Sequence, residues 1–121
     1  MLDSLRSYLS RVLLKWRRWR RRSFRGVVSV ESDRDPRPLI QARYLVLIGP
    51  TEQPKWARFS CPCGCGETLA LNLMRSLSPR WEVRRSEDGR ADVFPSVHSL
   101  PCNSHFWIRK SQVEWCTDEL F

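Results

Sequence analysis

The sequence has no apolar run long enough to cross a bilayer. The apolar stretch "YLSRVLL" is short and is interrupted by Arg11, whereas a membrane-spanning helix needs about 20 apolar residues. No secretory signal is visible either, because the positive charges of this segment follow the apolar stretch. These absences favour the reducing cytoplasm, with a membrane-peripheral location as an alternative. Clustered thiols there bind metal or do chemistry more often than they form disulfides.

Acidic residues are almost missing from the first 25 positions, where Asp3 is the only one. The basic residues of this segment are Arg6, Arg11, Lys15, Arg17, Arg18, Arg20, Arg21, Arg22 and Arg25. The segment therefore carries the whole net charge of +8, since the other basic and acidic residues cancel. The high pI gives no ground to expect nucleic-acid binding by the rest of the chain.

Residues 2–22 are predicted to form a basic amphipathic helix. One apolar stripe recurs at spacings of three and four: Leu2, Leu5, Leu9, Val12, Trp16 and Trp19. Three interpretations compete. Residues 2–25 could lie on an anionic membrane surface or bind the phosphate backbone of a nucleic acid. They could also be a loosely ordered extension, upstream of the true start codon.

The length of 121 residues allows one domain with a modest core. We expect the helix or extension to occupy residues 1–28. The polar stretch "SVESDRDPRP" indicates a linker over residues 29–38. Residues 39–121 would then form a Cys/His-rich β domain.

The patterns of residues 39–121 are those of β structure. "ARYLVLIG" reads as a buried strand, "ETLALNL" alternates leucines on one face, and "RWEVRR" alternates Trp81 and Val83 with charges. Asp88-Gly89 indicates a hairpin turn before "ADVFPS". "WARFS" and two short strands within "HFWIRKSQVEWC" complete the pattern. The expected fold is mainly β. It is a small domain of six or seven short strands, cross-linked by zinc and preceded in the chain by the basic amphipathic helix.

Five side chains in two short segments are candidate metal ligands. "CPCGCGE" contributes Cys61, Cys63 and Cys65, and "PCNSH" contributes Cys102 and His105. Zinc takes four thiolate or imidazole ligands in tetrahedral geometry, and the glycines let the thiols converge. A bound metal, zinc first, would also staple a small core. The alternatives are buried cysteines acting as small hydrophobes and a redox pair, for which one-residue spacing is unusual.

Five candidates exceed the four ligands of a closed site. If the four cysteines hold the metal, His105 is available as a general base. Ser96 and Ser104 are then the candidate nucleophiles, and Glu67 could orient an imidazole or act as an acid/base. Ser104 is the weaker candidate, because neighbours in an extended strand point to opposite faces. A catalytic zinc with an open water position is a further alternative, and His98 reads as a solvated loop residue.

Several short motifs of the chain occur in an order and spacing that resemble a bacterial protein family. "CPCGCGE", "LNL", "W-x-V", "PS-V", "PC-x-SH-x-WIR" and "V-x-W" over roughly Tyr44 to Cys116 are similar to domain-of-unknown-function family 6527. The matching site positions are Cys61, Cys63, Cys65, Glu67, Ser96, Cys102, Ser104 and His105. The chain departs from the family pattern at "PSVHSLPC", where a Gly- or Asn-containing loop with an aromatic residue is expected.

The resemblance implies a partner and an activity. Members are often encoded beside ubiquitin-like proteins and their activating and conjugating enzymes, in clusters associated with phage defence. It implies a peptidase that processes or removes a ubiquitin-like protein. Our first hypothesis for that peptidase is a Ser/His enzyme on a zinc-stabilised scaffold, with Ser96 as nucleophile and His105 as base. The alternatives are a non-catalytic zinc-binding interaction module, presenting Trp56, Trp81 or Trp107, and a tethered protein acting through residues 2–25.

Overall fold

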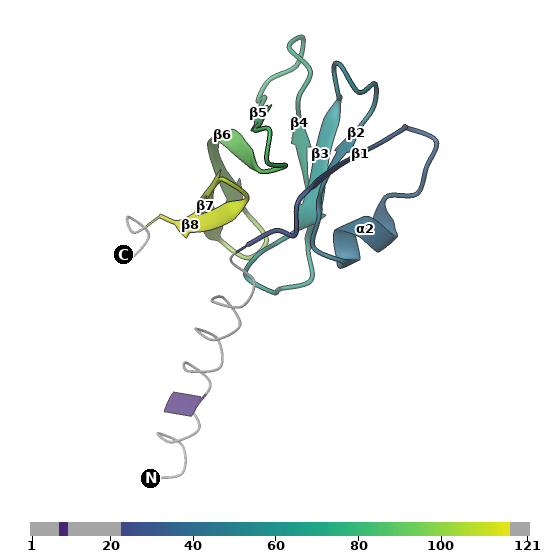
Figure 1. Cartoon of the computed structure of the whole chain (residues 1–121). Coiled ribbons are helices and arrows are strands. Elements are labelled where there is room, and N and C mark those ends of the chain that lie inside the picture. Colours follow the sequence, from purple (N-terminus) through teal and green to yellow (C-terminus); the bar gives the residue numbers. More distant parts are fainter. Residues whose placement is uncertain (1–7, 10–22, 117–121) are drawn as a thin grey trace.

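The computed structural model describes residues 8–9 and 23–116, so the helix expected over residues 2–22 lies almost wholly outside them. Residues 23–116 contain eight strands and one short helix (Figure 1). These are β1 (Val27–Val30), α2 (Arg37–Gln41), β2 (Leu45–Ile48), β3 (Trp56–Ser60), β4 (Thr68–Asn72), β5 (Glu82–Arg85), β6 (Ala91–Ser99), β7 (Ser104–Arg109) and β8 (Gln112–Trp115). The expectation of a mainly β fold is confirmed. No helix in this part of the chain is long and apolar enough to cross a membrane.

The strands form two four-stranded sheets, each following chain order. The first sheet runs β1-β2-β3-β4 and the second β5-β6-β7-β8. Only β1 and β2 pair in parallel, and the other neighbours are antiparallel. The β5–β6 hairpin turns at Gly89, whose φ of 82° is the left-handed value that Asp-Gly predicts.

The core lies between the two sheets. Fully buried Phe59 of β3 meets Phe106 of β7 edge to face, with ring centroids 6.4 Å apart. Phe24 also meets Phe59 edge to face, with ring centroids 5.3 Å apart. Trp81 and Val83, the alternating pair of "RWEVRR", both pack against this core. Burial of these apolar side chains is the main term that holds the sheets together.

Two elements differ from the sequence-based expectation. Strand β1 and helix α2 lie within or beside residues 29–38, which we expected to be a linker. β1 is the strand beyond the six or seven expected. It pairs in parallel with β2 across an intervening helix, and pairing of this kind leaves no local hairpin signal in the sequence.

Candidate active site and metal centre

The segment from Cys61 to Glu67 forms a tight loop after β3. The Cys61 amide donates to the Glu67 carbonyl at 2.8 Å, and the Gly64 amide donates to the Cys61 carbonyl at 3.2 Å. Gly64 and Gly66 have φ of 85° and 90°, which other residues rarely adopt. The glycines therefore let the chain curl back within six residues, and the thiols at alternate positions converge.

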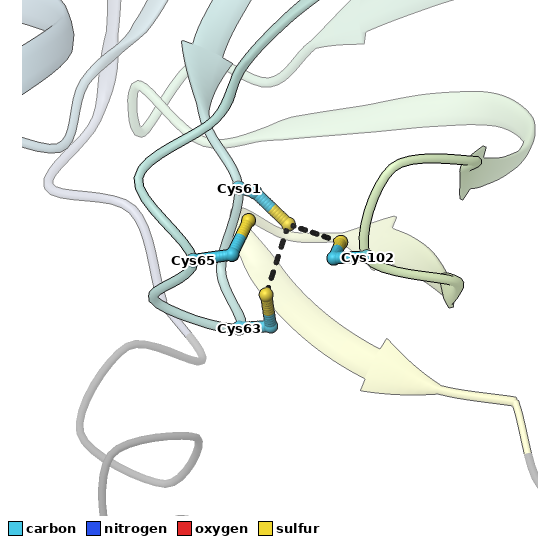
Figure 2. A group of neighbouring side chains, drawn as sticks. All are labelled: Cys61, Cys63, Cys65 and Cys102. Atoms are coloured by element: carbon cyan, nitrogen blue, oxygen red, sulfur yellow. Dashed lines mark hydrogen bonds between the residues drawn. The ribbon is translucent and has the colours of Figure 1, made fainter.

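Four sulfur atoms meet at this loop. Cys61, Cys63 and Cys65 face Cys102, which lies in the connection between β6 and β7 (Figure 2). The Sγ atoms all lie within 4.8 Å of one another; Cys61 Sγ is 3.4 Å from Cys63 Sγ and 3.5 Å from Cys102 Sγ. In a tetrahedral zinc–thiolate site with bonds of about 2.3 Å the sulfurs are about 3.8 Å apart. The cluster fits a metal ion bound by four thiolates.

Burial and hydrogen bonding act differently on these thiols. Burial raises the pKa of Cys61 far above its ordinary value, and burial also raises that of Cys65. Burial opposes ionisation of Cys102 too, but hydrogen bonds with the hydroxyls of Ser104 and Ser99, with Cys61 and with the Ser104 backbone together outweigh it. The two hydroxyls lie 3.2 and 3.3 Å from its sulfur, and the pKa of Cys102 is lowered to about 6.

A serine and a histidine meet on the outer face of the second sheet. Ser96 Oγ lies 2.8 Å from His105 Nε2, a hydrogen-bond distance at which the serine hydroxyl can donate to the ring nitrogen. Ser96 belongs to an irregularity of β6. Val93 pairs with Ile108, and Val97 pairs with Phe106. Between these two pairs β6 contains two more residues than β7, so the strand bulges there. Such a bulge re-aims a side chain, and here it accompanies the contact between Ser96 and His105.

The main chain on both sides of this pair is held by hydrogen bonds. The Trp81 indole N–H donates to the Ser96 carbonyl at 3.2 Å. The Cys116 amide donates to the His105 carbonyl at 3.0 Å. Trp81 also lines a groove of about 880 Å³ with Leu73, Met74, Arg80 and Val83. Trp81, which lines this groove, is therefore hydrogen-bonded directly to the backbone of Ser96.

The other expected site residues lie elsewhere. Ser104 is buried next to Cys102 and occupies the inward face of β7. Glu67 is exposed, and its carbonyl closes the cysteine loop. His105 is not part of the group of metal-ligating side chains within 4.8 Å, which among the described residues contains the four cysteines.

Sequence reasoning did not give His98 a place in the site. His98 lies in β6 directly opposite His105, and the two ring centroids are 5.3 Å apart. Its Nε2 is 2.9 Å from Asn103 Oδ1. The available signal was the two-residue spacing of Ser96 and His98, which places both on one face of an extended strand.

The fold and the site define a class: a small two-sheet β protein that carries a four-thiol cluster and a serine–histidine pair. Residues 31–116 match the family described as "Bacterial ubiquitination-like system serine protease (BubE)". The match covers well over half of the chain, and the chain belongs to this family. It supports the association with a bacterial ubiquitination-like system that the sequence resemblance implied. No curated protein and no solved structure matches the chain.

Proposed function

We propose that the protein is a serine peptidase in which Ser96 is the nucleophile and His105 its general base. One observation carries this proposal: the 2.8 Å contact between Ser96 Oγ and His105 Nε2, in a chain whose family is described as serine proteases. Ser104 and Glu67 have no role in the proposed step, because Ser104 faces the cysteine cluster and Glu67 is exposed.

The reaction is an acyl transfer in two halves. Ser96 Oγ attacks the scissile carbonyl carbon while its proton passes to His105 Nε2. The carbon–nitrogen bond breaks, and His105 returns the proton to the leaving amine. Water then attacks the acyl-enzyme, giving its proton to His105 and freeing the carboxylate product and Ser96. The groove lined by Trp81, whose indole N–H bonds the Ser96 carbonyl, is the proposed binding place of a substrate segment.

The four cysteines would hold a structural zinc ion. Four thiolates complete a tetrahedral zinc site and leave no open position for water. His105 is then not needed as a ligand, which is consistent with its contact to Ser96. In this proposal zinc supplies no step of the reaction and fixes the Cys61 loop against the β6–β7 connection.

The proposed substrate is a ubiquitin-like protein of the same bacterial pathway, processed or removed at its C-terminal tail. The family description supports the pathway, and the resemblance to family 6527 adds the activating and conjugating enzymes as partners and phage defence as the setting. The proposed location is the cytoplasm. Contact of residues 2–25 with an anionic membrane or a nucleic acid stays a prediction about a segment outside the described residues.

The experiment is a cleavage assay on a ubiquitin-like protein extended at its C-terminus. Ser96→Ala should lower the cleavage rate by at least about 10³-fold, because the nucleophile is lost. Metal content and the thermal midpoint should stay as in the parent. Ser32→Ala, at an exposed turn serine away from the second sheet, is the matched control and should cleave normally.

Undiminished cleavage by Ser96→Ala would overturn the proposal. Loss of metal in the same variant would also count against it, since Ser96 would then support the fold. No cleavage by the parent of any extended ubiquitin-like protein would favour the non-catalytic binding module instead.

A further inference from the structure

His98 and Asn103 form a small polar assembly beside the serine–histidine pair. His98 and His105 are directly opposite in the β6–β7 ladder, and their neighbours Val97, Phe106, Ser99 and Ser104 point inward. The two imidazoles therefore share the outer face of the sheet. Their ring planes are tilted by 32° at a centroid distance of 5.3 Å, which is within the range of direct ring contact.

Asn103 fixes the orientation of the His98 ring. The 2.9 Å contact joins His98 Nε2 to Asn103 Oδ1, so the ring nitrogen donates and the amide oxygen accepts. Asn103 has a φ of 52°, a left-handed conformation that asparagine tolerates better than most residues. It directly follows Cys102, so the turn that carries it is also tied to the cysteine cluster.

A catalytic imidazole at the surface of a sheet needs such support. His105 is only half-buried, and its side chain must keep Nε2 aimed at Ser96 Oγ. Catalytic geometry has to be held within about 0.5 Å, through packing and hydrogen bonds of the neighbouring residues. The His98 ring, packed beside His105 in a tilted arrangement, limits rotation of the imidazole away from the serine.

We infer that His98, held by Asn103, is a positioning residue for His105. The inference rests on the proposed function, in which His105 is the general base. His98 contacts neither the reacting atoms nor the metal cluster in this account. It acts by keeping the His105 ring in the orientation that reaches Ser96.

The test uses the full chain and a fluorophosphonate probe, which needs no knowledge of the natural substrate. In that reaction the Ser96 Oγ–P bond forms, the P–F bond breaks, fluoride leaves, and His105 takes the hydroxyl proton. His98→Ala and Asn103→Gly should each slow labelling about tenfold, because misplacement of a catalytic group by a fraction of an ångström has effects of this size. Glycine is chosen because it keeps the left-handed backbone at position 103.

Two further results separate positioning from a general structural role. The double variant His98→Ala/Asn103→Gly should be no slower than either single variant, because both changes release the same ring. His98→Phe, which keeps a planar ring, should recover most of the rate. In the cleavage assay kcat should fall with KM unchanged. Leu100→Ala, in the same connection and 80% exposed, is the control and should label at the parental rate.

Labelling within twofold of the parent for both single variants would overturn the inference, as would multiplicative effects in the double variant. If the parent does not react, the proposed function fails, and carbon-13 relaxation of the His105 ring still decides the positioning role. The chain has only two histidines, so the ring signals can be assigned by substitution. Greater motion of His105 in His98→Ala is expected, and unchanged motion would contradict the inference.

Discussion

Cys61 and Cys102 differ in how readily they give up a proton. Burial keeps Cys61 protonated, whereas the hydroxyls near Cys102 lower its pKa to about 6. The lowered pKa favours the thiolate form of Cys102, which is the form that binds a metal ion. Cys61 must then release its proton, because only the thiolate binds metal. A metal ion bound to the cluster would make ionisation of this buried sulfur favourable.

The ligand set can be tested one residue at a time. Cys61→Ser should lose the bound metal, because it removes the most buried sulfur of the cluster. Cys116→Ser should keep one metal ion per chain, since Cys116 lies outside the cluster. His105→Ala should also keep the metal while losing the proposed activity. Elemental analysis of the purified variants provides the measurement.

Retention of the metal by Cys61→Ser, or its loss in His105→Ala with the fold intact, would contradict this ligand assignment. The second result would make His105 a ligand, in the way that the five-candidate sequence pattern allowed.

At the scale of elements, the connection between β4 and β5 is organised by one buried side chain. The Asn72 amide nitrogen donates to the carbonyls of Met74, Leu77 and Pro79 at 3.1–3.3 Å. Its Oδ1 accepts from the Met74 amide at 3.0 Å. The Trp81 amide in turn donates to the Asn72 carbonyl. Asn72 thus fixes the start of β5 and the tryptophan that bonds Ser96.

Asn72→Ala should therefore lower the free energy of unfolding by about 2 kcal/mol, because the hydrogen bonds from this buried side chain to the β4–β5 connection are lost. Denaturant unfolding measures the change. Asn72→Asp keeps an acceptor for the Met74 amide but sets a carboxylate oxygen against the carbonyls that the amide nitrogen bonded, so it should destabilise at least as much. A change below about 0.5 kcal/mol in Asn72→Ala would show that water replaces the side chain without cost.

A strand or turn could be predicted from the sequence where the residues that determine it lie close together in the chain. The alternation of Trp81 and Val83 and the Asp88-Gly89 turn are local signals, and they correctly predicted one face of β5 and the β5–β6 hairpin. β1 was not predicted, because its parallel pairing with β2 has no local turn signal. The place of His98 opposite His105 depends on the register of the β6–β7 hairpin, which spacing alone does not fix.

The cysteine cluster, too, was predictable only in the part that depends on local sequence. The spacing of Cys61, Cys63 and Cys65 around glycines made a metal site the leading expectation. Which four of the five candidates meet depends on the long-range placement of Cys102 and on the outward face of His105. Both are properties of the assembled sheets and cannot be read from a short segment.

At the scale of the whole molecule, the cysteine cluster links the two sheets. Three thiols follow β3 of the first sheet, and Cys102 lies between β6 and β7 of the second (Figure 2). The aromatic contact between Phe59 and Phe106 joins the same strands from within the core. A metal ion in the cluster would close a loop of about 40 residues, which favours the folded state over the unfolded chain.

Removal of the metal with a chelator should lower the midpoint of thermal unfolding by more than about 10 °C, because its binding free energy contributes to folding. The parent protein and Cys61→Ser are compared with and without chelator. The variant should unfold at the lower temperature in both conditions. An unchanged midpoint in the parent after complete metal removal would show that the core alone holds the sheets together.

The central claim is that Ser96 is a nucleophile activated by His105. The most direct measurement is intact-mass analysis with peptide mapping after incubation of the parent and His105→Ala with a fluorophosphonate. We expect one adduct per chain on Ser96 in the parent and labelling at least about 10²-fold slower in His105→Ala. No adduct in the parent, or an adduct on Ser104 instead, would contradict it.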